Sequence, residues 1–353
     1  MKKSLSLSFL FIGTVVGAGF SSGREILTFF SASSGLAPLA VVACGVVFFL
    51  ACFLLLTIAS RVDIYDISSL CSYLPTKIRT AFESILIFFF VIICAMMISG
   101  ADSLFGAGGG IGISGILLFI LGSGVAIFGI SGLLKVNFVL VPILLTFIVF
   151  ISCFHLYRSG VPSFDFTNPN YLTSIFEGVS YSSMNLLLSA VVLLSAGKGL
   201  KRREILISSA LSAVIISTVI MLFFLAMNTS SEFLLADMPI IPMTRYISPL
   251  FRWTSLACIW IAIFTTFSSS FLTCFEYFKR FCKSAPLRIL ILLAITYPIS
   301  RFGFSQIVTI FMPAMGLFGI ILLFFCLRIW RGTKPKKKYT AHKNFDVGVT
   351  PLD

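Results

Sequence analysis

The chain has 353 residues, of which 58% are hydrophobic and 11% are charged, and its formal net charge is +13. A soluble domain uses about 25% charged residues, so this composition excludes a cytosolic enzyme, a disordered chain and, despite the net charge, a nucleic-acid-binding domain. The mean hydropathy of +1.06 and the 39 phenylalanines indicate an integral membrane protein.

Nearly uncharged apolar segments follow one another along the chain. A helix of about 20 residues crosses a hydrocarbon core of about 30 Å, and ten segments have roughly this length. They cover residues 5–30, 36–60, 81–103, 111–134, 136–156, 171–196, 205–227, 250–278, 289–304 and 305–330. Only Gly303, Ser305 and Gln306 interrupt the apolar sequence between the last two. The sequence therefore predicts an all-α membrane protein with ten transmembrane helices.

The distribution of the 26 Lys and Arg residues agrees with ten helices. Basic residues in short loops stay on the cytoplasmic side of a membrane. With both termini in the cytoplasm, only Arg158, Arg245, Arg252 and Arg301 lie outside, and Arg24 lies within the first segment. One missing or additional helix would invert every later loop. We therefore predict a multi-pass protein of the cell membrane with cytoplasmic termini.

The first segment contains an unusual run, Gly13-Thr-Val-Val-Gly17-Ala-Gly19-Phe-Ser-Ser-Gly23-Arg-Glu25. Glycine costs a helix about 1 kcal/mol relative to alanine, and a helix in lipid unwinds only where protein, water or a ligand satisfies the freed backbone groups. We predict an unwound stretch from Gly17 to Gly23. The alternative is close packing of another helix on Gly13 and Gly17, which does not call for the two charges that follow.

A second polar run, residues 177–185 (Glu-Gly-Val-Ser-Tyr-Ser-Ser-Met-Asn), lies in the sixth segment. The sixth helix would run opposite to the first, five crossings later. Two interrupted helices at equivalent places in oppositely oriented halves are typical of inverted-repeat transporters, which bind their cargo near the midplane. We therefore predict a five-helix repeat in residues 1–157, its inverted copy in 158–330, and a basic cytoplasmic tail in 331–353.

A third polar cluster, Thr265-Thr-Phe-Ser-Ser-Ser270, lies in the eighth segment. Serine and threonine hydroxyls often bond back to their own helix, so helix packing is one interpretation of this cluster. The other is a neutral oxygen cage for a hard monovalent cation, formed by these hydroxyls and by carbonyl groups freed at the break in the first segment. We favour cation coordination.

The glycine-rich run resembles the first helix of the sodium-coupled neurotransmitter and amino-acid symporters, which have the LeuT-type fold of the APC superfamily. The whole string from Gly13 to Glu25 is similar to that of YkvI-like bacterial membrane proteins. The resemblance implies a sodium site made by the residues Gly13, Val16, Thr265, Ser268 and Ser269. The first three would give their carbonyl oxygens and the two serines their hydroxyls.

Two further positions bear on the coupling ion. Phe20 stands where the family's second sodium site has an asparagine, which argues against a second ion. Proton-coupled relatives carry a lysine within the fifth helix, whereas the fifth segment here has Lys135 only at its start. This difference favours sodium.

The resemblance also implies a substrate site between the first, third, sixth and eighth helices. Its residues would be Ala18, Gly19, Phe20, Ser21, Ser22, Ser180, Tyr181, Ser183 and Asn185. The family's outer gate pairs an arginine of the first helix with an acid of the tenth, but residues 305–330 contain no acid. We expect Arg24 to pair with Glu25 or Glu177 instead, either as an outer gate or as a structural group at the interface.

These features predict a secondary active transporter, a sodium-coupled symporter of an amino acid or similar small zwitterion that works by alternating access. The alternative is a membrane receptor or sensor with the same fold that binds a small ligand without moving it. No nucleophile–base pair or metal-ligand spacing is visible, so we predict neither an enzyme nor a cofactor other than sodium as the coupling ion. The expected partners are a small-molecule substrate and the lipid bilayer, with no nucleic acid and no obligate protein partner.

Overall fold

The computed structural model describes residues 2–31, 34–62, 70–74, 76–105, 112–128, 131–163, 170–197 and 199–333, and all regular elements within these ranges are helical. The all-α prediction is therefore confirmed. Six helices are long and apolar enough to cross a membrane: α4 (Ala37–Val62), α6 (Thr76–Ser103), α8 (Ser131–Ser159), α10 (Arg202–Met227), α13 (Pro249–Phe278) and α15 (Phe304–Gly332). Three shorter apolar helices join them: α1 (Lys2–Val15), α7 (Ile113–Phe128) and α14 (Ala285–Ser300).

A further helix, α9 (Tyr171–Ala196), has 26 residues, as many as α4 and α10. Within the described ranges, each of the ten predicted segments contains helix. The last two are separated at Gly303, whose φ of 89° ends the turn between α14 and α15. Three short helices that we did not predict are η1 (Ser34–Leu36), α11 (Ser231–Leu235) and α12 (Ile240–Arg245). The five-plus-five symmetry and the side of the termini stay predictions.

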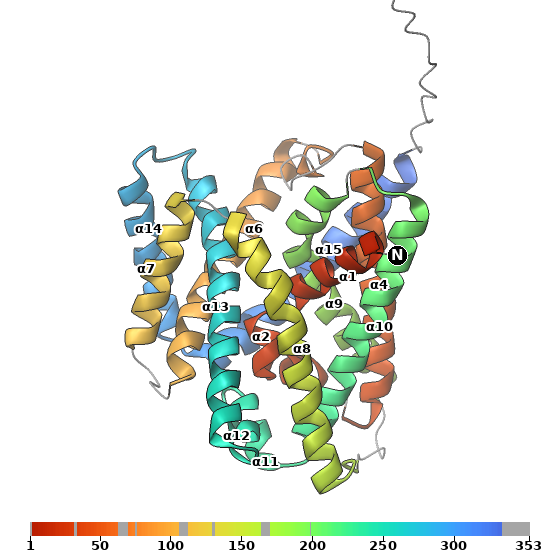
Figure 1. Cartoon of the computed structure of the whole chain (residues 1–353). Helices are drawn as coiled ribbons and strands as arrows, with labels where there is room; N and C mark the ends of the chain where they lie inside the picture. The colour runs from red at the N-terminus through yellow and green to blue at the C-terminus, as the bar shows by residue number, and fades with distance from the viewer. Residues whose placement is uncertain are drawn as a thin grey trace, which may run out of the picture.

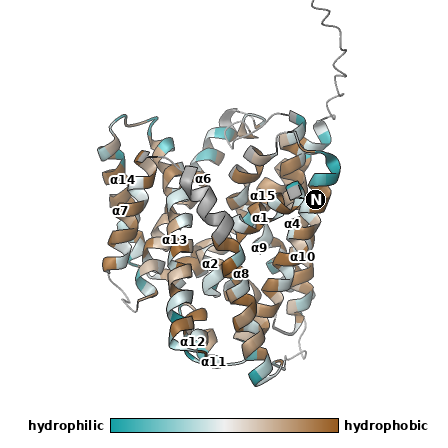
Figure 2. Cartoon of the chain, in the orientation of Figure 1, coloured by the Kyte–Doolittle hydropathy of each residue, from teal (hydrophilic) through white to brown (hydrophobic). Residues whose placement is uncertain are grey.

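The helices pack in two groups (Figure 1). The first group contains α1, α4, α9 and α10, with α9 lying between α4 and α15, and the second contains α6, α7, α13 and α14. Helices α8 and α15 contact both groups. Hydrophobic residues cover the middle of α7, α10 and α14, and hydrophilic residues gather near the ends, for example around α12 (Figure 2). Each group thus combines helices from both predicted halves of the chain.

The first predicted helix is broken, as expected. Helix α1 ends at Val15, and the N–H of Gly17 turns back to the carbonyl of Val15 at 2.8 Å instead of continuing the helix to the carbonyl of Gly13. Helix α2 (Ala18–Ser22) follows, and α3 (Arg24–Phe30) begins after Gly23, whose φ of 85° favours glycine. The predicted unwound stretch is therefore two interruptions on either side of one helical turn.

The predicted break in α9 is wrong, because α9 is one continuous helix. Two of its polar side chains bond within the helix or to the neighbouring α4. The Ser182 hydroxyl donates to the carbonyls of Gly178 at 2.7 Å and Cys44 at 3.0 Å, and the Asn185 amide donates to the carbonyl of Tyr181 at 3.0 Å. These side chains thus find partners without any break in the backbone of the helix.

Small residues also let α9 approach both of its neighbours closely. A Cβ atom at Gly178 would lie 2.0 Å from the carbonyl oxygen of Ala40 on α4. On α15, a Cβ at Gly316 would lie 2.2 Å from the Ser180 hydroxyl, and one at Gly319 would lie 2.0 Å from the Ser183 carbonyl oxygen. The small residues Gly178, Ser180 and Ser183 of this run therefore form packing contacts, as found between membrane helices.

Candidate functional site

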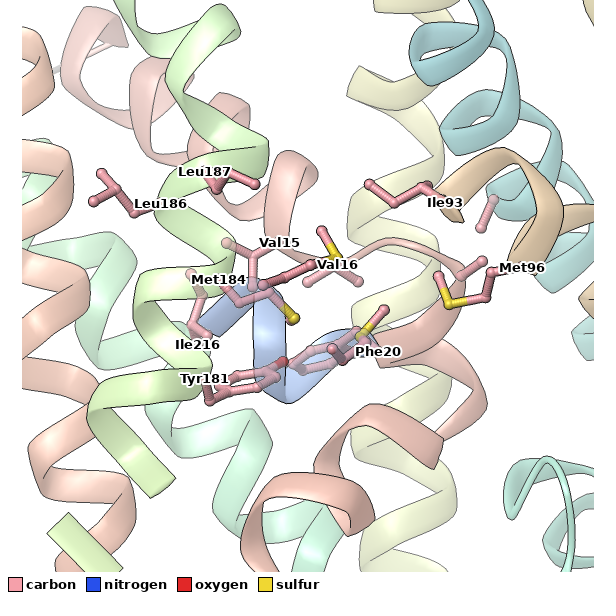
Figure 3. Close-up of a cluster of buried hydrophobic side chains, with 14 of the residues drawn as sticks. Val15, Val16, Phe20, Ile93, Met96, Tyr181, Met184, Leu186, Leu187 and Ile216 are labelled. Atoms are coloured by element: carbon pink, nitrogen blue, oxygen red, sulfur yellow. The ribbon is translucent and has the colours of Figure 1, made fainter. Parts of the chain in front are cut away.

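The candidate site lies where the broken first helix meets the other group of helices. Helix α2 packs against α12 and α13, whereas α3 packs against α9, α10 and α15. Figure 3 shows Val16 and Phe20 of the broken helix opposite Tyr181 and Met184 of α9, with Met96 of α6 on the far side. All five side chains are buried. The break therefore sits inside the protein, at the boundary between the two groups.

The predicted substrate residues of α2 are buried, but their hydroxyls already have partners. Ser21 donates to the carbonyl of Ala18 at 3.2 Å, and Ser22 donates to the carbonyl of Gly19 at 2.8 Å. Phe20 contributes its apolar ring to the site (Figure 3). This segment therefore offers an apolar surface and backbone groups, rather than the free serine hydroxyls that the sequence suggested.

The predicted substrate residues of α9 are buried and differ in what they face. Ser180 is buried against α15, as shown by the short distance between its hydroxyl and a Cβ atom built on Gly316 of that helix. The ring of Tyr181 lies edge-on to Phe29 at 5.2 Å and Phe30 at 5.4 Å, and it points toward Phe20 in Figure 3. The structure thus brings Tyr181, but not Ser180, to the broken helix.

Buried polar atoms without a hydrogen-bond partner are concentrated on the predicted site. Among the residues that the structure describes, they include the Tyr181 hydroxyl, the Ser183 hydroxyl, the Asn185 carbonyl oxygen, the Ser268 hydroxyl and Nε of Arg24. A buried polar group left unpaired costs about 1–3 kcal/mol, so native proteins usually provide it with a partner. Tyr181 and Asn185 are four residues apart and share one face of α9, whereas Ser183 lies on the opposite face. Only the first two therefore indicate one place for a polar guest.

The cation ligands expected on α13 do not all face the break. Ser269 is exposed and donates to the carbonyl of Thr266 at 3.0 Å, and the hydroxyl of Ser268 lies 3.6 Å from a Cβ built on Gly122 of α7. Thr265 is buried and donates to the carbonyl of Ala262 at 3.0 Å.

The hydroxyl that lies beside the break is that of Thr266. Its Oγ1 would be 3.2 Å from a Cβ built on Gly17. The sequence analysis included Thr266 in the polar cluster but did not choose it. The carbonyl group of Gly13 lies in the last turn of α1, and the break deprives it of its helical partner, the N–H of Gly17. The structure therefore places the hydroxyl of Thr266, two residues before Ser268, beside the break.

Glu25 and Arg24, two of the three expected gate residues, have different surroundings. Glu25 is only 5% exposed, and its carboxylate packs on the backbone of α2, where a Cβ at Gly19 would lie 1.7 Å from Oε1. In the described part of the chain no ion pair joins Arg24 to Glu25. Instead the carboxylate of Asp237, between α11 and α12, acts on the guanidinium of Arg24. Glu177 lies near the start of α9. The sequence analysis missed Asp237, because it lies outside every apolar segment.

An open cavity of about 650 Å³ lies elsewhere, between the end of α6, the start of α7 and α13. Its walls include Phe105, Leu117 and Trp260, and its acid is Asp102. That carboxylate already accepts a hydrogen bond from the N–H of Gly115 at 2.7 Å, so it serves to cap α7. The described residues contain no cluster of three or more metal-ligating side chains either here or at the break. We therefore place the candidate site at the break.

Comparisons with known proteins agree with a membrane protein. No family model matches the chain. Two uncharacterised proteins of Bacillus subtilis resemble it over most of its length. The membrane protein YkvI is 23% identical over 325 residues, which cover 90% of this chain and 93% of YkvI. The protein YyaD is 25% identical over 344 residues, covering 91% of this chain and 95% of YyaD.

The fold also resembles that of a solved transporter. A crystal structure of a variant of the Eremococcus coleocola manganese transporter has a TM-score of 0.51 and 14% identity, and the match covers 93% of this chain and 78% of that one. Identity this low shows the fold alone. The chain is therefore a membrane protein with the fold of a membrane transporter.

Proposed function

We propose that this protein is a secondary active transporter that couples sodium entry to the uptake of a small organic solute, such as an amino acid. The observation that carries this proposal is the broken first helix beside the unpaired polar groups of α9. Irregular backbone at membrane depth is tolerated where it lines a binding site, and broken helices mark the cargo site in many transporters.

The proposed sodium ligands are oxygen atoms from both groups of helices. The carbonyls of Gly13 and Val16 come from the first group, and the hydroxyl of Thr266, with Thr265 beside it, comes from α13 of the second. Oxygen ligands suit hard cations. Ser268 and Ser269 would join only if α13 rotated about its axis, since their hydroxyls face other directions in this structure.

The proposed cargo binds between α2 and α9. Tyr181 and Asn185 offer hydroxyl and amide groups, and Ala18 to Phe20 offer backbone and an apolar ring. An amino acid carries both hydrogen-bond donors and acceptors, so it can satisfy such groups. Helix α2 contacts the second group of helices, and α3 contacts the first. Cargo and sodium that bind at this boundary can therefore stabilise one arrangement of the two groups over another. Coupling requires such a preference.

This proposal is tested by ligand-induced stabilisation of the purified protein. We expect one or a few amino acids to raise the thermal unfolding midpoint in sodium buffer, because a ligand stabilises the state that it binds. The same amino acids should have little effect when potassium replaces sodium. Stabilisation by no amino acid, amine or related solute in either buffer would contradict the proposal.

The Tyr181 hydroxyl gives a second test, because it is buried and its polar neighbour is the side chain of Asn185, one turn along α9. Tyr181→Phe should change the unfolding midpoint of the ligand-free protein little, since it removes at most one hydrogen bond between neutral groups. It should weaken binding of the stabilising amino acid by about tenfold, the equivalent of one hydrogen bond worth ~1.4 kcal/mol. Both quantities come from the same thermal titration.

The matched control for this substitution is Tyr246→Phe. The Tyr246 hydroxyl donates to Glu232 at 2.9 Å on the exposed surface, so its loss should not change the affinity for the amino acid. Equal affinity of wild type and Tyr181→Phe would remove Tyr181 from the cargo site.

A further inference from the structure

Glu25 differs from the other buried acids that the structure describes. Glu83 forms ion pairs with Arg79 and Arg280, both at 3.1 Å, and Asp102 accepts a hydrogen bond from the backbone of α7. In the part of the chain that the structure describes, no basic group lies within 4.0 Å of the Glu25 carboxylate, and the side chain is buried. An isolated ionised carboxylate in apolar surroundings is costly, and such a group is neutralised instead. Its surroundings therefore favour the uncharged carboxyl group.

The backbone around Glu25 is shaped to receive its side chain. The left-handed turn at Gly23 lets α3 fold back toward α2. Because Gly19 has no Cβ, the carboxyl group can lie directly against the backbone of α2. On the opposite side Tyr181 is close enough to interact with Glu25 electrostatically. Glu25 thus joins the broken segment to α9.

The titratable groups around Glu25 provide no fixed positive charge. The titratable groups on the first part of α9 are Glu177 and Tyr181, and Tyr181 interacts with both Glu25 and the thiol of Cys44 on α4. Arg24 on the same helix interacts with Asp237 instead, and α2 has no titratable side chain. The charged residues of α10 and α15 lie at the ends of those helices, at Arg202, Arg203, Glu204, Arg328 and Arg331.

We propose that Glu25 is a proton-binding site, and that a proton moves across the membrane with the cargo. The proposal rests on the transport function proposed above. The carboxylate takes a proton from water on one side, forming an O–H bond, and returns it to water on the other side; nothing is oxidised or reduced. The neutral carboxyl group stays against Gly19, whereas the ionised group needs water and leaves this contact. Proton binding thereby controls how firmly α2 and α3 pack.

Infrared difference spectroscopy of the purified protein during a pH titration tests this proposal, with the proton as the ligand. We expect a carboxylic C=O band that disappears as the pH rises and that is lost in Glu25→Gln, which keeps the size of the side chain. The matched control is Glu83→Gln, which removes a buried but ion-paired glutamate and should keep the band. If Glu25→Gln does not fold, Glu25→Asp should shift the titration midpoint of the same band.

The outcomes separate this proposal from the transport function. A titrating band that Glu25→Gln leaves unchanged would overturn the proton site, even if the protein transports its cargo. Loss of lysine binding in Glu25→Gln with no change in the band would also overturn it, and would show that Glu25 holds an ammonium group instead. A band that depends on Glu25 in a protein that drives no flux would support the proton site and contradict only the transport function.

Discussion

Thr266→Ala is expected to weaken sodium binding by at least tenfold, a loss of about 1.4 kcal/mol. The Thr266 hydroxyl is the oxygen of α13 that lies beside the break, and a hydrogen-bonding or ligand group to a charge contributes about 1.5–3 kcal/mol. The measurement is the sodium concentration that gives half of the thermal stabilisation of the purified protein. Thr266→Ser keeps the hydroxyl and should bind sodium almost as well as the wild type.

The same titration distinguishes Thr266 from the two serines expected from the sequence. Ser269 is exposed and Ser268 faces α7, so we expect the double substitution Ser268→Ala and Ser269→Ala to change the sodium affinity less than Thr266→Ala does. If the double substitution abolishes sodium binding and Thr266→Ala does not, the sodium site lies further along α13 than we propose.

Gly178→Ala is expected to destabilise the protein by about 3 kcal/mol, the upper part of the usual range for overpacked cores. The new Cβ would lie 2.0 Å from the carbonyl oxygen of Ala40. This atom belongs to the backbone of α4, so it cannot rotate away as a side chain can, and α4 and α9 must separate. We expect a lower thermal midpoint and less monodisperse protein.

Gly124→Ala is the matched control for this substitution. Gly124 also lies inside a helix, α7, but nothing is within 4 Å of a Cβ built there. Alanine favours helix over glycine by about 1 kcal/mol, so this variant should be as stable as the wild type or slightly more stable. Equal stability of Gly178→Ala and Gly124→Ala would show that α9 does not contact α4 as closely as the structure indicates.

The broken first helix could be predicted from the sequence because its cause is local. Gly17 and Gly23 are positions where a helix is weak and where a left-handed or extended residue fits. No long-range contact is needed for this inference. The helical segments were predictable for a similar reason, since the length and composition of an apolar run decide whether it can cross a membrane.

The continuity of α9 could not be predicted from its own residues. Its polar run resembles an unwound segment, but the hydroxyl of Ser182 bonds both within the helix and to α4. Gly316 and Gly319, which make room for it, lie more than a hundred residues away on α15. Helix packing of this kind depends on the partner helix, which a local pattern does not reveal.

For related reasons, the sequence did not show which face of α13 turns toward the break or which acid interacts with Arg24. The hydroxyls of residues 265–270 occupy several faces of one helix, and only the tertiary structure shows that Thr266 faces the break. Asp237 lies in a short connection with no periodic pattern. The sequence therefore indicated which helices meet at the break, but not which of their side chains face it.

Uptake by proteoliposomes under an imposed sodium gradient tests most directly whether this protein is a sodium-driven transporter. We expect the amino acid that stabilises the purified protein to accumulate inside the vesicles when sodium is higher outside, and to reach no more than equilibrium when sodium is equal on both sides. Saturable binding of that amino acid without any flux would contradict the proposed function and would indicate a receptor.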